Sequence, residues 1–112
     1  MGKRILFSVM FMGMLALMAS PVLASENKHL HEAIEHTEEA IEHGEQGHAD
    51  AVVTHAEVAL KHGKVAAKEM HNPHVDEGLA HLEEAIEHGK AGHADVATKH
   101  AKTALMHLQE AH

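Results

Sequence analysis

The 112-residue sequence contains no cysteine, tryptophan or tyrosine, and both of its phenylalanines lie within the first eleven residues. Without cysteine the chain has no disulfide, no thiolate ligand for a metal and no cysteine nucleophile. It also has only two prolines. Because proline interrupts helices, its scarcity leaves long stretches free to be helical.

The first 24 residues have the composition of a secretory signal peptide. Lys3 and Arg4 form a short positive segment, and residues 5–19 are apolar. Small residues follow a Ser-Pro pair, which predicts cleavage between Ala24 and Ser25. The apolar run is short for a membrane span, and no cysteine is available for a lipid anchor. We therefore expect an exported protein that leaves the membrane after cleavage.

The remaining 88 residues are acidic and rich in histidine. They hold all 17 acidic residues, seven lysines and all 15 histidines, so their net charge is about −10 with neutral imidazoles. Such a charge argues against binding to nucleic acid and to anionic membranes. The length suits one small domain, residues 25–112, and we expect it to be a monomer.

The chain is internally duplicated with an offset of 45 residues. Residues 29–67 and 74–112 are identical at 20 of 39 aligned positions, and the segments HTEEAIEHG and HLEEAIEHG correspond. Two copies of one supersecondary unit are therefore present.

Each copy contains two helical patterns that are separated by a glycine-bounded turn. The turns are GEQG at 44–47 and GKAG at 89–92, and we expect the first glycine of each to end a helix. Ser25 is the candidate cap of the first helix, while Asn72 and Pro73 are expected to cap and open the third. Helices are predicted near 26–44, 47–70, 73–89 and 92–111. Short turns favour an all-α, up-down-up-down antiparallel four-helix bundle built from two duplicated hairpins.

Apolar residues recur at the spacing of one helical face, which predicts the core. In the first two helices this stripe consists of Leu30, Ala33, Ile34, Thr37, Ala40, Ile41, Ala49, Val52, Val53, Ala56, Ala59 and Leu60.

Twelve histidines form four rows of three, with seven residues between successive members of a row. One row lies on each predicted helix: His29, His36, His43; His48, His55, His62; His74, His81, His88; His93, His100, His107. Seven residues are nearly two turns, so each row follows one side of its helix with about 10.5 Å between members. In the first two helices the rows lie roughly 100–120° from the centre of the apolar face. Histidine therefore lines one flank of the core stripe.

When two such helices pack antiparallel, their histidine flanks meet across a seam. The sequence positions place the members of facing rows at matching heights, with His36 opposite His55 and His81 opposite His100. Two arrangements remain open. The rows can face each other within each hairpin, or the row of the first helix can face that of the fourth and the row of the second helix that of the third. The short turns favour pairing within hairpins.

Carboxylates lie four residues before several of these histidines, at a spacing that brings side chains together on a helix. They are Glu32, Glu39, Glu77 and Glu84, which we predict to be secondary ligands. Each pair of facing imidazoles, with a nearby carboxylate and water, forms a site for one ion, so the rows are expected to bind several Cu²⁺ ions. Zn²⁺ and Ni²⁺ fit the same donors. Cu²⁺ is expected to bind most tightly by the Irving–Williams order.

Two other functions would also make use of histidine. A surface that buffers or senses acid would also need many histidines, since imidazole titrates near pH 6.5. Catalysis has weaker support: the Glu-x-x-His motifs of di-iron bundles are matched in letters by Glu26–His29 and Glu45–His48, but at a helix start and across a turn. No lone serine or cysteine nucleophile, phosphate loop or haem-attachment motif stands out, and we predict that the protein is not an enzyme.

The EEAIEHG heptads, the GHAD and TKHAK segments and the signal peptide resemble the small metal-binding protein family. The resemblance covers essentially the whole mature chain. It implies a periplasmic bundle that takes up several Cu²⁺ ions, accepts other divalent metals, and serves copper storage, buffering or detoxification.

Overall fold

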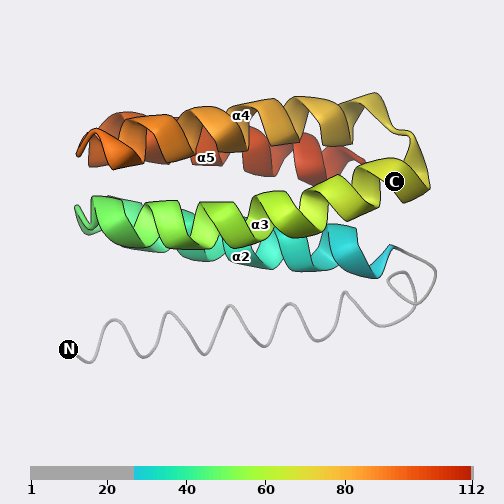
Figure 1. The fold of residues 1–112 in the computed structure, drawn as a ribbon, viewed down its shortest axis with the longest axis horizontal. Coiled ribbons are helices and arrows are strands. Elements are labelled where there is room, and N and C mark those ends of the chain that lie inside the picture. The colour runs from blue at the N-terminus through green and yellow to red at the C-terminus, as the bar shows by residue number, and fades with distance from the viewer. Residues whose placement is uncertain (1–26, 112) are drawn as a thin grey trace.

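The computed structural model of the protein describes residues 27–111, which form four α-helices (Figure 1). The helices are α2 (Lys28–Glu45), α3 (Ala49–Met70), α4 (Pro73–Lys90) and α5 (Ala94–Glu110). The four predicted helices agree with these bounds to within about two residues, the usual uncertainty of helix ends. The predicted signal peptide, residues 1–24, lies outside the described residues.

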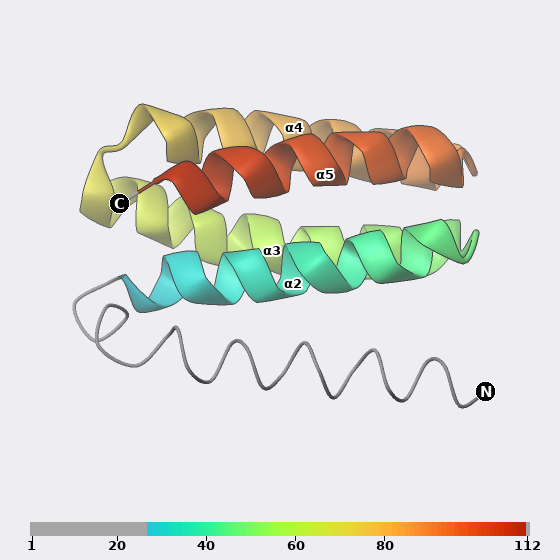
Figure 2. The same cartoon turned by 180° about the vertical axis from the view of Figure 1, so that it is seen from behind.

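The helices pack as two antiparallel hairpins laid against each other. Helix α2 pairs most extensively with α3, and α4 with α5, while α3 contacts α4 and α2 contacts α5. Both hairpin turns lie at one end of the bundle, and the α3–α4 connection lies at the other (Figures 1 and 2). The predicted all-α four-helix bundle is confirmed. Between residues 27 and 111, no helix combines the length and low polarity that are needed to cross a bilayer.

The helix ends differ in part from the prediction. Helix α2 is capped by Asn27, whose side chain accepts a hydrogen bond from the Leu30 amide, and Ser25 lies outside the described residues. The predicted Asn72 cap is confirmed, because its side-chain oxygen accepts from the His74 amide at 2.8 Å. Proline follows it at the first position of α4, where its missing amide proton costs no hydrogen bond.

The first glycine of each turn does not end its helix, contrary to the prediction. Gly44 and Gly89 are buried inside α2 and α4, and the positive φ values belong to Gly47 and Gly92, at 84° and 86°. A Cβ on Gly89 would lie 2.7 Å from Val53, so this glycine is required by the close approach of α3. Gly44 is in the equivalent position against Thr98 of α5.

The core is narrow because most of its members are small. Ten of the sixteen buried apolar residues between 27 and 111 are alanines, and the largest fully buried side chains include Leu30, Leu82 and Leu108. The predicted apolar stripe is buried or partly buried along both helices of the first hairpin. Thr37 is also buried, and its hydroxyl donates to the Ala33 carbonyl at 2.7 Å. Small side chains let helix axes approach closely, which brings the groups that flank the core into contact across each seam.

Candidate metal centre

The histidine rows face each other within each hairpin, as the favoured arrangement predicts. The ring centroids of His36 and His55 are 6.1 Å apart, and those of His81 and His100 are 5.5 Å apart. All six predicted facing pairs are in contact, with centroid distances between 5.4 and 6.5 Å. The alternative arrangement, with rows meeting between the first and fourth helices, is therefore wrong.

The facing rows are staggered rather than level. His36 stacks on His62 at 6.0 Å as well as on His55, and His43 stacks on His55 at 5.0 Å. Each inner ring thus lies between two rings of the opposite helix, and the expected isolated levels merge into continuous stacks. We call these the N-terminal column (His29, His62, His36, His55, His43, His48) and the C-terminal column (His74, His107, His81, His100, His88, His93). Neighbouring rings within a column are 5.0–6.5 Å apart.

The predicted position on the flank of the core is visible in the exposure of the rings. Nine of the twelve imidazoles are half-buried, while His48, His74 and His93 at the column ends are exposed. The Nδ1 atoms of His36, His43 and His107 are shielded from solvent and have no hydrogen-bond partner. A buried polar atom without a partner is costly, and a bound cation would supply the partner that each of these nitrogens lacks. Histidine nitrogen is also a common ligand of divalent transition metals.

The four predicted carboxylates all lie beside histidines, although not always beside the expected one. Glu84 contacts His88 four residues later, at 3.7 Å, as predicted. Glu32 instead reaches across the seam to His62 at 3.7 Å, and Glu77 similarly reaches His107 at 3.5 Å.

Glu39 also departs from the expected contact with His43. Its Oε1 lies 3.0 Å from His55 Nδ1 across the seam and 3.6 Å from His36 Nδ1. The reason is geometric: on this flank, the facing row is as near as the next turn of the same helix.

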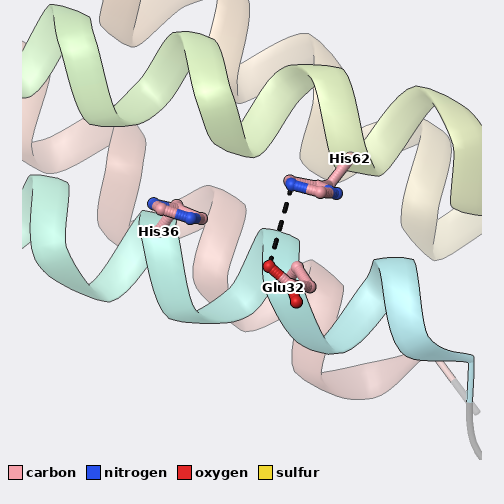
Figure 3. A group of neighbouring side chains, drawn as sticks. All are labelled: Glu32, His36 and His62. Atoms are coloured by element: carbon pink, nitrogen blue, oxygen red, sulfur yellow. Dashed lines mark ion pairs between the residues drawn. The ribbon is translucent and has the colours of Figure 1, made fainter.

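Four groups of three donors have their ligand atoms within 4.8 Å of one another. They are Glu32, His36 and His62; His36, Glu39 and His55; His74, His107 and Glu110; and Glu84, His88 and His100. Figure 3 shows the first group, in which Glu32 and His36 from α2 lie beside His62 from α3. Each group has two imidazoles and one carboxylate. Modest side-chain movement would bring such donors to the roughly 2 Å metal–ligand distances of bound Zn²⁺.

Glu110 was not predicted as a ligand. Its carboxylate lies 3.4 Å from His74 Nδ1, across the C-terminal hairpin. The available signal was its position three residues after His107, which also brings side chains together on a helix. The remaining row members, His29, His43, His48, His81 and His93, belong to a column but to none of the four groups.

Glu45, in the turn-spanning match to a di-iron motif, does not face the histidine columns. Its carboxylate pairs with Lys102 of α5 at 3.0 Å. Glu26, in the other match, lies outside the described residues.

Two seams of half-buried imidazoles with adjacent carboxylates define a histidine-rich, metal-binding four-helix bundle. Comparison with protein-family models agrees, because the model of the small metal-binding protein family matches residues 2–111. The chain therefore belongs to this family. A comparison with curated proteins found no match.

Proposed function

We propose that the protein takes up several Cu²⁺ ions along its two histidine columns and stores, buffers or detoxifies copper. The observation that carries this proposal is the continuity of the columns. Twelve imidazoles lie in two stacks, and seven of them belong to groups that include a carboxylate. Nitrogen and carboxylate donors suit Cu²⁺, Zn²⁺ and Ni²⁺, and the Irving–Williams order places Cu²⁺ first.

The role is binding rather than catalysis. The donor groups lie along the flanks of the two hairpins, and several of their carboxylates are more than half exposed. Storage or buffering requires several ions that can enter and leave, and partly exposed sites permit both. The protein acts as a monomer in this proposal.

The proposed location is the periplasm. This part of the proposal is supported by the sequence of residues 1–24, with its positive segment, apolar run and small-residue cleavage site. In cell fractionation, the protein should be recovered in the periplasmic fraction with Ser25 as its first residue. Recovery with the membranes and an intact first segment would contradict export in soluble form.

A titration of the purified protein with Cu²⁺, Zn²⁺ and Ni²⁺ tests the function itself. At neutral pH we expect several Cu²⁺ ions per chain and weaker uptake of the other two metals. Copper affinity should collapse as the pH falls through about 6.5, because protonated imidazole cannot bind a metal. Proton uptake without binding of any of the three metals would instead support an acid-buffering protein. Copper binding that is unchanged at about pH 5 would show that the carboxylates, and not the imidazoles, are the ligands.

A further inference from the structure

We call two histidines that face each other across a seam, together with the carboxylates beside them, a level. The spacing of histidine and glutamate distinguishes the level at one end of the C-terminal column from every other level. A glutamate follows a row histidine by three residues at five places in the sequence. Four of these pairs lie on α2 and α4, the first helices of the hairpins. On α3 and α5, the second helices, only His107 is followed in this way, by Glu110. Residues three apart are neighbours on a helix, so only at this level do both facing helices present an imidazole beside a carboxylate.

The four side chains of this level contact one another reciprocally. His74 of α4 lies 3.4 Å from the Glu110 carboxylate of α5, and His107 of α5 lies 3.5 Å from the Glu77 carboxylate of α4. The two rings are stacked with their centroids 5.9 Å apart. His107 Nδ1 is shielded from solvent and has no hydrogen-bond partner. At the open end of the C-terminal hairpin, the ligand atoms of His74, His107 and Glu110 therefore lie within 4.8 Å of one another, and Glu77 adds a second carboxylate beside His107.

The equivalent level of the N-terminal hairpin lacks one of these four donors. At an offset of 45 residues, its members are His29, Glu32, His62 and Val65. Valine replaces the second carboxylate, and the two imidazoles contact each other directly, with 3.2 Å between their Nδ1 atoms. The internal duplication thus provides a natural comparison between a level with two carboxylates and one with a single carboxylate.

We propose that His74, Glu77, His107 and Glu110 form a distinct four-donor site for a divalent transition-metal ion, and that this site fills first. The proposal rests on the metal binding proposed above and adds the order in which the columns load. Two carboxylates neutralise the charge of a divalent cation, whereas the equivalent N-terminal level supplies only one negative charge. A second carboxylate close to the ion adds a Coulomb attraction that is substantial near a protein surface.

Sub-stoichiometric Cu²⁺ added to isotopically labelled protein shows which site is filled first, because the paramagnetic ion broadens the NMR signals of nearby amides. We expect the earliest broadening at the start of α4 and the end of α5. Glu110→Val, which makes this level resemble its N-terminal counterpart, should abolish that preference. It should also weaken the first binding step by roughly tenfold to a hundredfold, the range found when groups that support a metal site are removed. The reciprocal change, Val65→Glu, should create a second early site at the start of α2 and the end of α3.

Glu110→Gln provides the matched control for folding, since it removes the charge from an exposed side chain and conserves its shape. It should reproduce the loss seen with Glu110→Val, with unchanged helix content by circular dichroism. Uniform broadening along both columns, or an unchanged first step in both Glu110 variants, would overturn the assignment while leaving copper binding intact. A wild-type protein that binds no copper would instead refute the proposed function.

Discussion

His36 shows how a single residue can serve more than one donor group. Its ring lies between His62 and His55, and it belongs both to the group with Glu32 and to the group with Glu39. The side chain is 29% exposed, so packing orients the ring while an ion can still reach it. Half-burial on the flank of a helix therefore combines order with access, which neither a core position nor a fully exposed position provides.

Glu38 lies off the columns and has a different electrostatic environment. Burial raises the pKa of this carboxyl above its ordinary range, and the neighbouring charge of Glu35 raises it further, while His31 acts in the opposite direction. A pKa that is higher in the folded state means that the folded protein holds this proton more tightly than the unfolded chain does. The contribution of Glu38 to stability is thus greatest at low pH and is lost as the pH rises through the folded-state pKa.

We therefore expect Glu38→Gln to raise the melting temperature at neutral pH, because it removes a carboxylate that is partly desolvated. The gain should shrink as the pH falls towards the carboxyl range, where Glu38 itself becomes neutral. Thermal melts by circular dichroism at several pH values measure the effect. Glu42→Gln, which removes an exposed carboxylate from the same helix, is the control. Equal gains for the two variants would show that overall charge, rather than the burial of Glu38, is responsible.

At the scale of the elements, the turn of each hairpin determines how its two helices are aligned along their seam. In the first hairpin, the Gly47 amide bonds to the Gly44 carbonyl at 2.9 Å and the His48 amide to the His43 carbonyl at 3.0 Å. The second hairpin repeats this pattern at positions 88–93 with almost the same distances. The first imidazole after each turn is thereby held beside the last imidazole before it. From there, the seven-residue period continues the column along both helices.

This arrangement predicts that histidines couple across a seam but not across the bundle. Gln substitutions at His36 and His55, singly and together, should affect Cu²⁺ binding non-additively, because the two rings belong to one donor group. His36 and His100 lie on different hairpins, so their effects should add. Calorimetric titration of the two double-mutant cycles provides the measurement. Additive behaviour at His36 and His55 would mean that these residues do not share an ion.

In the whole molecule, complementary charges connect the two hairpins. Glu45 of α2 pairs with Lys102 of α5, and Lys90 of α4 pairs with Glu57 of α3. These pairs occupy equivalent positions in the two copies, with the charges exchanged. If two N-terminal copies packed together in the same way, glutamate would face glutamate, and two C-terminal copies would place lysine against lysine. The exposed pairs add little stability, but this pattern favours association of unlike hairpins.

The alanine-rich core and the acidic surface together predict a modestly stable apo protein. Small buried side chains remove little apolar area from water, and the net charge of about −10 over residues 25–112 adds self-repulsion. An ion held between facing helices binds the folded state more tightly than the unfolded one. It therefore stabilises the fold by RT ln(1 + [L]/Kd), about 2.7 kcal/mol when free metal is a hundred times Kd.

We expect a helical apo protein that melts at modest temperature and gains several degrees with Cu²⁺. Metal binding to the unfolded histidine-rich chain should reduce the gain below the ideal value. Melts monitored by circular dichroism, with and without copper, test this expectation. A very high apo melting temperature that copper does not change would show that the ions bind to the surface of an already rigid bundle and do not link its helices.

The sequence alone determined the fold class and the helix positions, and it favoured, without deciding, the pairing of histidine rows within each hairpin. These features follow from local periodicity: a 3.6-residue helix places residues seven apart on one side, and the short turns make neighbouring helices antiparallel. The cap at Asn72 was equally local, since it depends on the first turn of α4 alone.

Only the tertiary structure decided how the facing rows interleave and which carboxylates reach which rings. The stagger that places His36 between His62 and His55 depends on how closely α2 and α3 pack and how their axes are offset. Likewise, the contact between Glu39 and His55 requires a distance across the seam that no spacing along one helix contains. The prediction that Gly44 ends its helix was wrong for the same reason. A glycine is needed there because a Cβ would collide with Thr98, which is distant in the sequence but directly opposite in space.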